Sequence, residues 1–530
     1  MKSKRADHPK GVILNAYPDS LGGKLGTLVT LVAQSDLEDA FSMVYILPTF
    51  FHSDLDRGFS IIDYDLNEEL VQNSDLQSLR EKGIDLKLDI VLNHLSVSSP
   101  QFQDLLEYGE NSQFKDFFIN WNHFWTGNGQ PGPDGVIIPD QEYLDKLFTR
   151  KPELPVLKVP FPDGSEQPYW NTFYQETRIE SSNGQEVKRT LLGQMDVNAQ
   201  SEAVWVFYDE TLSKLRDYGC KIVRLDAFAY LHKEVGSSNF FNRPGTWNYL
   251  ERIRKMAETK GLSLLPEIHA EYGSGLHEEV ASKGFLIYDF FLPGLILHTL
   301  ETGSKKALLK WAREIQEKGY KTINMLGCHD GIPLLDLKGK EVNGAYKEGL
   351  LEDEEIENLL DTILRRGGRI KNLYDPNGRK ISYYQVNATY FSALGEDPRK
   401  LLLARAIQLF MPGTPQIWYL DLFAGKNDYA AADKLGKAGH KEINRTNLTL
   451  AEIELTQSNK IVKDQLTLLR VRNSVEAFDG VLTIHSTDES LLDVEWRYGN
   501  DKARLRADLN ALNFEVDYWI NRKRHHLTFS

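Results

Sequence analysis

Eight short apolar segments, separated by longer helix-like or loop-like stretches, constrain the fold of this chain more than any other feature. The segments are rich in aliphatic and β-branched residues and are bounded by turn residues, which is typical of buried strands. Strands that alternate with helices along a chain indicate a parallel sheet covered by helices. The pattern predicts an α/β fold, a (β/α)8 TIM barrel, with strands at 12–17, 44–47, 86–92, 221–225, 262–265, 285–288, 323–326 and 416–419.

One helix of this barrel can be predicted closely. Residues 202–218 place Val204, Phe207, Leu212 and Leu215 roughly on one face, as an amphipathic helix does. We therefore expect a helix there, packed by that face directly before the strand at 221–225.

Two long excursions interrupt the alternation. About 125 residues rich in aromatics, Gly and Pro separate the third and fourth strands, far more than a crossover needs. We expect residues 1–92, 198–331 and 396–480 to form the barrel. The other expected parts are an inserted subdomain after strand 3 (93–197), a smaller insertion with a mobile loop after strand 7 (332–395), and a C-terminal antiparallel β-domain (481–530).

Composition and charge exclude several other classes. The 530 residues include 62 Lys and Arg against 76 Asp and Glu, a net charge of −14, so no nucleic-acid surface is expected. No stretch of about 18 apolar residues occurs, so we expect no membrane segment and a cytoplasmic protein. Cys220 and Cys328 lie in apolar segments and are expected to be buried thiols rather than disulfide or zinc ligands. The oligomeric state stays open, with a homodimer as one option.

Three carboxylates stand at the ends of predicted strands: Asp226, Glu267 and Asp330. Active-site residues of a TIM barrel lie at the C-terminal strand ends. Retaining cleavage of an α-glucosidic bond needs one carboxylate as nucleophile and another as acid and base, and a third acid helps where positive charge develops. These residues therefore predict such a site. Arg224 lies two residues before Asp226, on the same strand face, and is expected to keep that carboxylate ionised.

The segments around these carboxylates resemble a known family. Four of them, in order, are similar to the four sequence regions of the α-amylase clan of glycoside hydrolases: Asp89-Ile-Val-Leu-Asn-His94, Arg224-Leu-Asp-Ala227, Glu267-Ile-His269 and Cys328-His-Asp-Gly331. Other segments, such as Tyr17-Pro-Asp-Ser-Leu-Gly-Gly23 and Glu442-Ile-Asn-Arg445, look like the sucrose phosphorylase subfamily. The resemblance spans nearly the whole chain.

This resemblance implies roles for individual residues. Asp226 would be the nucleophile that forms a β-glucosyl ester, Glu267 the acid and base, and Asp330 a ligand of the sugar hydroxyls. Asn93 can bind calcium in amylases, but the sucrose phosphorylase group usually lacks the ion, so we expect no metal and no cofactor, with phosphate as co-substrate. The glucose ring would be bound by Asp56, Phe59, His94, Phe173, Arg224, Tyr230, His269, His329, Gln385 and Arg445.

A phosphorylase must also hold a phosphate dianion beside two carboxylates, which requires cations at the acceptor subsite. Residues 148–155 resemble the Tyr-Arg-Pro-Arg-Pro-Gly-Leu-Pro segment of sucrose phosphorylases. Lys151 would then replace the phosphate-binding arginine, with Arg150 beside it. Tyr384 and Gln385 match the Tyr-Gln pair of the family's mobile loop, which implies a phosphate ligand and a gate of the site.

Two departures from the subfamily fall in the acceptor region. Ser382 stands where sucrose phosphorylases have Asp, and Ala270-Glu271 stands in place of Ser-Tyr. Glu271 would accept hydrogen bonds from a neutral polyol and repel a carboxylate or a phosphorylated fructose. We therefore predict a retaining α-glucoside phosphorylase, a hexosyltransferase. Its expected donor is glucosylglycerol, then sucrose, and then sucrose 6'-phosphate or glucosylglycerate.

Two other classes stay open. An α-glucosidase of the same clan would share every carboxylate but lack the cationic phosphate site, and donor cleavage indifferent to phosphate would favour it. A non-catalytic carbohydrate-binding or transporter-associated relative would usually have lost a carboxylate or gained a membrane segment. The sequence has neither feature.

Overall fold

The structure, a computed structural model, describes residues 10–34, 37–149, 153–182, 185–374, 380–434, 436–485, 488–520 and 522–529. At 34, 180–182, 185–188, 371–374, 380–385 and 436–438 this description covers the backbone alone. None of the helices in this part of the chain is long and apolar enough to cross a membrane.

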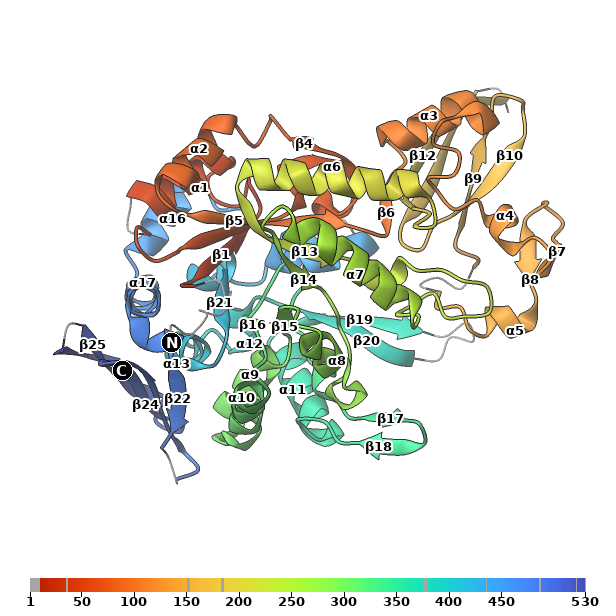
Figure 1. The fold of residues 1–530 in the computed structure, drawn as a ribbon. Helices are drawn as coiled ribbons and strands as arrows, with labels where there is room; N and C mark the ends of the chain where they lie inside the picture. Colours follow the sequence, from red (N-terminus) through yellow and green to blue (C-terminus); the bar gives the residue numbers. More distant parts are fainter. Residues whose placement is uncertain are drawn as a thin grey trace. The chain divides into compact units, whose positions relative to one another are not determined.

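Eight strands form one sheet in the order β14-β13-β5-β2-β1-β21-β16-β15 (Figure 1). The printed registers of β1 with β2 and β21, of β13 with β14, and of β16 with β15 and β21 are parallel. Each strand overlaps a predicted segment, so the (β/α)8 barrel is confirmed. The bounds are β1 (Ile13–Ala16), β2 (Met43–Ile46), β5 (Asp85–Val91), β13 (Cys220–Asp226), β14 (Ser263–Pro266), β15 (Ile287–Asp289), β16 (Thr322–Asn324) and β21 (Thr414–Trp418).

The chain divides into two compact units. The first comprises Met1–Ile46, Gln72–Leu86 and Ile268–Ser530, and the second comprises Leu47–Val71 and Lys87–Glu267.

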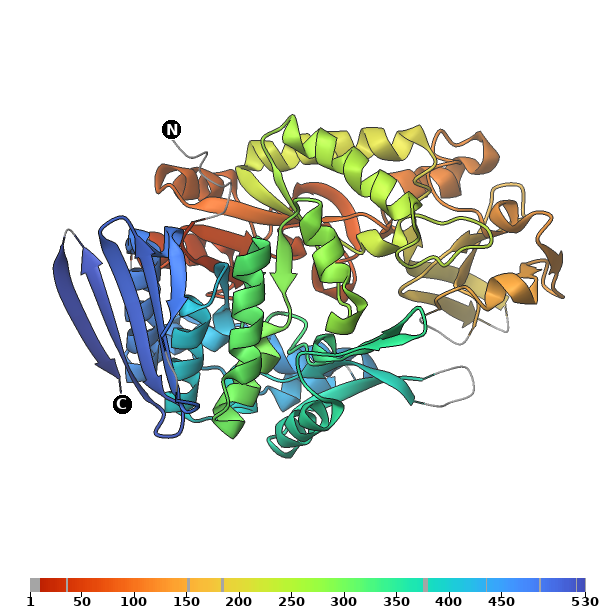
Figure 2. The ribbon, with the colours of Figure 1, turned by 60° about the horizontal axis from the view of Figure 1, so that its bottom comes forward.

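The first unit carries helices around its strands and ends in a separate sheet. Helix α13 (Pro398–Phe410) is buried from Leu401 to Phe410 and, apart from Arg405 and Gln408, apolar there, as the inner helix of a packed layer is. Five antiparallel strands follow in order from β22 (Val481–Ile484) to β26 (Lys523–Phe529), shown in blue in Figure 2. Trp496 of this sheet donates its Nε1–H to the carbonyl of Phe410 at 2.8 Å, which ties the sheet to α13. The predicted C-terminal antiparallel β-domain is confirmed.

The smaller insertion after the seventh strand, β16, also lies in this unit. It contains the hairpin of β17 (Lys340–Val342) and β18 (Ala345–Lys347). It then continues through α11 (Asp353–Arg365) to the hairpin of β19 (Arg369–Tyr374) and β20 (Lys380–Asn387). The insertion agrees with the predicted architecture.

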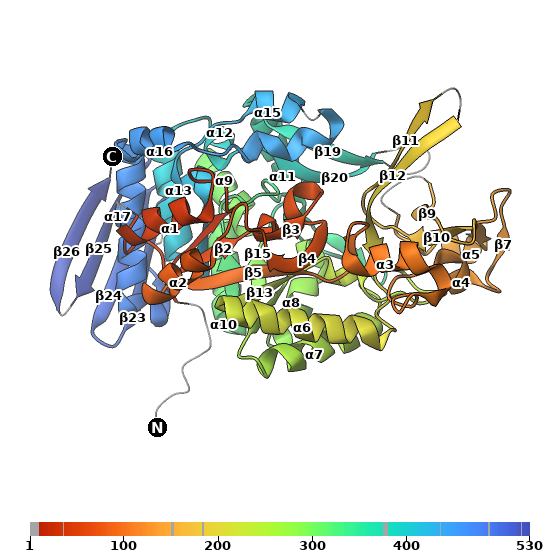
Figure 3. The same ribbon diagram turned by 90° about the horizontal axis from the view of Figure 1, so that it is seen from above.

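In the second unit, helices α6 (Glu202–Tyr218) and α7 (Gly245–Glu258) run side by side (Figures 1 and 3). The predicted helix at 202–218 is confirmed at both ends. Its buried face includes Val204, Leu212 and Leu215, whereas Phe207 is half-buried because Trp205 and Tyr208 turn inward instead.

The insertion after the third strand, β5, forms most of the rest of this unit. A cluster of Trp121, Trp125 and Trp170 fills its core. The long strand β12 (Gln185–Asp196) pairs antiparallel with β6 (His94–Ser96), which sets Asp196 opposite His94. This pairing brings the insertion's last strand to the residues that follow β5.

Candidate active site

Arg224 links three carboxylates in the second unit. Its Nη1 lies 2.5 Å from Oδ1 of Asp89 and 3.1 Å from Oδ1 of Asp226, and its Nη2 lies 2.5 Å from Oε1 of Glu267. The Arg224 and Asp89 side chains are buried, whereas Asp226 is 14% exposed and Glu267 15% exposed. The two predicted catalytic carboxylates therefore reach solvent around one buried guanidinium.

Strand pairing explains why these groups converge. The register of β13 with β14 sets Arg224 opposite Leu265, two residues before Glu267. The Glu267 N–H donates to the Leu225 carbonyl at 3.2 Å, and the Leu92 N–H donates to the Asp226 carbonyl at 3.1 Å. Ala227, directly after Asp226, has a φ of 53°, which is unfavourable for a residue with a Cβ and is common at functional sites.

The contact between Arg224 and Glu267 is additional to the predicted contact with Asp226. Arg224 was expected to favour ionisation of Asp226, and it contacts Glu267 at a shorter distance. A guanidinium stabilises every carboxylate that it contacts. Arg224 alone therefore does not separate the nucleophile from the acid.

Aromatic rings line the neighbourhood of Arg224. The ring centroids of His94 and Phe173 are 4.8 Å apart, and those of Phe173 and Tyr230 are 5.2 Å apart. The Cζ of Arg224 lies 5.4 Å from the centroid of Phe59. The four predicted substrate-binding rings thus lie close to one another and to the carboxylates, and they offer an apolar wall against which a sugar ring can pack.

His94 presents an unused hydrogen-bond acceptor in this wall. Burial lowers the pKa of His94 to about 4, so the ring is neutral near pH 7. Its Nε2 lies 3.0 Å from the Phe59 carbonyl and therefore carries the proton. Nδ1 is buried and has no hydrogen-bond partner among the described residues. A buried acceptor of this kind suits a ligand hydroxyl.

Asp56 lies on an exposed, strained turn in the same unit. Asp56, Arg57 and Gly58 all have positive φ values, of 47°, 49° and 109°. A Cβ at Gly58 would meet the backbone nitrogen of Thr49 at 2.5 Å, so only glycine fits there. This turn leads directly into Phe59.

A buried cation that the sequence interpretation missed occupies the position next to Asn93. The Lys233 Nζ lies 2.8 Å from Oδ2 of Asp196 and donates to Asn93 Oδ1 and to the Tyr230 carbonyl, each at 2.8 Å. Asp196 also accepts from the N–H and hydroxyl of Thr172. The ammonium therefore already supplies positive charge to the oxygen of Asn93 that a calcium ion would use.

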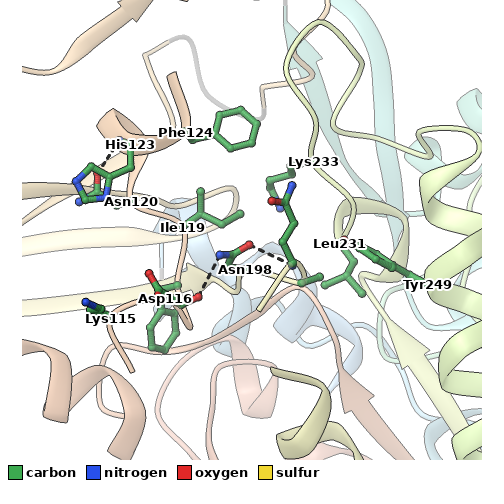
Figure 4. A pocket seen from close by; sticks show the side chains of 13 residues that line it. Lys115, Asp116, Ile119, Asn120, His123, Phe124, Asn198, Leu231, Lys233 and Tyr249 are labelled. Carbon is green, nitrogen blue, oxygen red and sulfur yellow. Dashed lines mark hydrogen bonds between the residues drawn. The ribbon is translucent and has the colours of Figure 1, made fainter. Parts of the chain in front are cut away.

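A pocket of about 210 Å³ opens beside Lys233 in this unit. Figure 4 shows its lining, which comes from α4 (Trp121–Trp125) and the residues before it, the residues before α6, the segment after Tyr230, and α7. The buried ionic group in the lining, Lys233, is paired with Asp196, and Asn198 donates to the Asp116 carbonyl. The glucoside site is therefore better assigned to the carboxylates around Arg224.

In the first unit, Asp330 lies among cations after β16. Its Oδ1 is 2.5 Å from Nζ of Lys441 and 3.6 Å from Nη2 of Arg445, and its Oδ2 is 3.1 Å from Nε2 of His329. Burial favours the neutral acid, but the charges of His329, Lys441 and Arg445 outweigh it and hold the pKa of Asp330 well below its usual range. Asp330 is therefore an anion near neutral pH.

Hydrogen bonds hold the backbone that carries His329 and Asp330. The Arg445 Nε–H donates to the His329 carbonyl at 2.8 Å, and the Asn444 amide donates to the Cys328 carbonyl at 2.7 Å. The ring of His329 lies edge-on to that of Tyr17, with centroids 6.4 Å apart. His329, Asp330 and Arg445, all predicted to bind the sugar, thus form one cluster, to which Lys441 is an addition.

Two further predicted residues of this unit, His269 and Glu271, lie on the segment after Glu267. His269 stacks on Phe290, with ring centroids 3.9 Å apart, and its Nδ1 lies 3.4 Å from Oδ1 of Asp336. The Glu271 carboxylate accepts from Nζ of Lys340, on hairpin β17–β18, at 3.0 Å. The predicted preference for a neutral acceptor depends on the negative charge of Glu271, and the ammonium of Lys340 compensates that charge.

Comparisons with known proteins identify the family. A model of the α-amylase catalytic domain matches residues 18–278. Over 514 residues the chain is 56% identical to the sucrose 6(F)-phosphate phosphorylase of Ilumatobacter coccineus, covering 97% of each chain. The chain belongs to the sucrose phosphorylase-like enzymes of the α-amylase family.

Two further members of this family differ in their named donors. The chain is 30% identical to the glucosylglycerol phosphorylase of Marinobacter adhaerens, covering 96% of each chain. The crystal structure of a sucrose 6F-phosphate phosphorylase from Thermoanaerobacter thermosaccharolyticum matches with a TM-score of 0.85 at 32% identity, covering 99% of each chain. The predicted family and the class of glycoside phosphorylase are confirmed.

Five predicted residues of this family member cannot be placed by their side chains. Arg150 and Lys151 lie outside the described residues. Ser382, Tyr384 and Gln385 belong to strand β20, where the description covers the backbone and sets Gln385 opposite Lys371. Their roles toward phosphate stay predictions.

Proposed function

We propose that this enzyme is a configuration-retaining phosphorylase that transfers glucose from sucrose 6F-phosphate to phosphate and forms α-D-glucose 1-phosphate. The identity of 56% over nearly the whole chain to a protein named for that activity is the observation that carries the choice of donor. The carboxylates joined by Arg224 support the retaining chemistry, because both half-reactions take place at two carboxyl groups.

The mechanism follows from the chemistry of these two groups. The Asp226 carboxylate attacks the anomeric carbon while protonated Glu267 gives its proton to the departing oxygen of the fructose moiety, which leaves a β-glucosyl ester. A phosphate oxygen then attacks the same carbon from the vacated face and expels Asp226. Glu267 takes up the proton that phosphate loses, so the enzyme returns to its starting state.

Arg224 contributes to both steps in this proposal. It stabilises Asp226 as a nucleophile and as a leaving group. Its contact with Glu267 favours the ionised form, which is the base of the second step, and opposes the acid form of the first. Release of that contact when the donor enters would let Glu267 accept its proton.

The other residues supply binding. Phe59, Phe173 and Tyr230 would pack against the glucose ring, His94 Nδ1 would accept from a hydroxyl, and Asp330 would accept from others as the ring distorts toward the transition state. His329 and Arg445 support Asp330, and Asp56 and His269 are further candidates for sugar contacts. Phosphate would be held by Lys151, Arg150 and the Tyr384-Gln385 pair.

Glucosylglycerol is the second candidate donor. Glu271 favours it, because a carboxylate accepts hydrogen bonds from a polyol and repels a phosphorylated sugar. Lys340 weakens this preference, since its ammonium compensates the charge of Glu271. Glu271 would therefore not repel a phosphorylated donor through an uncompensated negative charge.

The same proposal assigns the enzyme to the cytoplasm and assigns it no metal ion or cofactor. Lys233 supports the second point, because its ammonium neutralises Asp196 and uses the oxygen of Asn93.

The test supplies phosphate together with sucrose 6F-phosphate, sucrose, glucosylglycerol or glucosylglycerate, and follows glucose 1-phosphate. We expect the fastest formation from sucrose 6F-phosphate, and proton NMR of the first product should show the α anomer. A β-anomeric product would exclude the retaining mechanism. If glucosylglycerol is converted faster than sucrose 6F-phosphate, glucosylglycerol becomes the proposed donor.

A further inference from the structure

Lys441 makes the closest charged contact to Asp330. Its Nζ lies 2.5 Å from Oδ1, against 3.6 Å for the nearest Arg445 nitrogen. The Lys441 side chain is 17% exposed and that of Asp330 is 13% exposed. An ion pair that is largely removed from water is screened far less than a surface pair, so its loss is felt at the remaining charge.

We propose that Lys441 is a positioning residue of this reaction: it holds the Asp330 carboxylate ionised and in a fixed orientation for the sugar hydroxyls. The inference rests on the proposed role of Asp330 in binding the glucose ring. Lys441 itself is not assigned a contact with the sugar.

The other charges around Asp330 cannot replace this contact. Arg445 directs Nε to the His329 carbonyl and Nη1 to Oε1 of Glu442, 3.2 Å away, so its charge is shared. His329 contacts the other carboxylate oxygen, Oδ2, at 3.1 Å. Tyr17 packs against both Arg445 and His329 and brings no cation. Lys441 is therefore the cation in closest contact with Oδ1.

The local fold supports this division of labour. Lys441 belongs to the 3-10 segment Gly436–Asn444, whose last residue donates to the Cys328 carbonyl and accepts from Nε1 of Trp418. This anchoring fixes the segment relative to the backbone of Asp330. Because the backbone is already fixed, the ion pair costs only the rotamer entropy of the Lys441 side chain.

The test compares Lys441→Gln, Lys441→Arg and the control Lys460→Gln. Lys460 forms an exposed ion pair of 2.6 Å with Asp464 in the same unit. We expect kcat/KM of Lys441→Gln with α-glucose 1-phosphate to fall about 10- to 100-fold near neutral pH. Lys441→Gln should also lose activity at a higher pH than the parent on the acid side, because loss of the nearby opposite charge raises the pKa of Asp330 by about one unit or more and brings its protonation into the measured range. Lys441→Arg should restore the acid limb, and Lys460→Gln should match the parent enzyme.

A second measurement does not depend on activity. With aspartate labelled at 13Cγ, the signal that disappears in Asp330→Asn reports the titration of Asp330. In the parent it should stay ionised down to the lowest pH at which the protein is folded. In Lys441→Gln, or in Lys441→Met if that variant alone folds, Asp330 should titrate at a higher pH. Parent-like titration and a parent-like acid limb would overturn the role of Lys441. If Asp330 titrates at a higher pH in Lys441→Gln but the parent enzyme shows no phosphate-dependent transfer, the proposed function is overturned and the role of Lys441 is not.

Discussion

Replacing Lys233 with Met should destabilise the second unit by about 3–5 kcal/mol, the usual consequence of removing one partner of a buried ion pair. Asp196 and Lys233 are 0% and 2% exposed, so water cannot solvate the carboxylate that remains. Met keeps the length of the side chain and its packing near Trp170, 5.5 Å from the ammonium. The substitution therefore removes the charge with little loss of volume.

The magnitude follows from the contacts that the ammonium loses. Asp196 would keep its two bonds from Thr172 but no cation, and the acceptors on Asn93 and Tyr230 would each lose a donor. An unsatisfied buried acceptor costs about 1–3 kcal/mol. These losses are not additive, because the three acceptors surround one group, which keeps the total near the range for a broken buried pair.

Urea unfolding followed by circular dichroism would measure the change. Lys214→Met is the matched control, because Lys214 forms an ion pair of 2.5 Å with Asp65 at an exposed site of the same unit. The control should lose less than about 1 kcal/mol. Adding Asp196→Asn to Lys233→Met should recover part of the stability. Equal unfolding curves for Lys233→Met and its control would refute the assignment of a structural role to this cation.

Three further predictions concern pH, acceptor charge and metal. The pKa of His94 is about 4 in the folded state and about 6.5 in the unfolded state. Between these two pH values the unfolded chain binds a proton at His94 and the folded chain does not. The free energy of unfolding should therefore fall by about 3 kcal/mol from pH 6.5 to pH 4. His94→Gln should lack that part of the slope in urea titrations, and an unchanged slope would contradict burial of a neutral ring. Lys340→Gln should raise KM for fructose 6-phosphate about 2- to 5-fold and leave that for glycerol unchanged; an equal effect on both would exclude a charge effect of Lys340. Dialysis against EDTA should leave activity unaltered, and activity restored by Ca²⁺ would contradict the expected independence of metal.

The barrel and the positions of its carboxylates could be predicted because both depend on patterns along the chain. Strand β13 shows this, since its alternation puts Arg224 and Asp226 on one face, and the structure brings the two within 3.1 Å. The contact of Arg224 with Glu267 could not be predicted in this way. It depends on the register between β13 and β14, which alternation within one strand does not specify.

Lys233 and Lys441 show a second limit. Lys233 follows the motif Arg224-Leu-Asp-Ala227, and Lys441 precedes Glu442-Ile-Asn-Arg445. Neither lysine lies in a helix or strand whose buried and exposed faces could be predicted from the sequence pattern. Lys233 is buried beside Asp196, which lies 37 positions earlier in the chain, and Lys441 meets Asp330 over 111 positions. A lysine in a loop is usually exposed, so sequence alone favours the opposite environment. A carboxylate without a predicted partner, such as Asp330, is the signal that could have prompted a search for such cations.

The donor was harder to predict from the sequence because a charge on one element is compensated by a residue on another. Glu271 alone favours a neutral polyol, but the hairpin β17–β18 brings Lys340 to within 3.0 Å of it. The sequence places these residues 69 positions apart, so the sign of the local field depends on the fold.

Release of phosphate from α-glucose 1-phosphate is the most direct test of the proposed function. The reaction would be run with fructose 6-phosphate, fructose, glycerol, glycerate or water alone, with Asp226→Asn as the blank. We expect release that depends on an added acceptor and is fastest with fructose 6-phosphate, whereas the blank should be inactive. Equal release in water alone would contradict a phosphorylase and would identify a hydrolase of the same family.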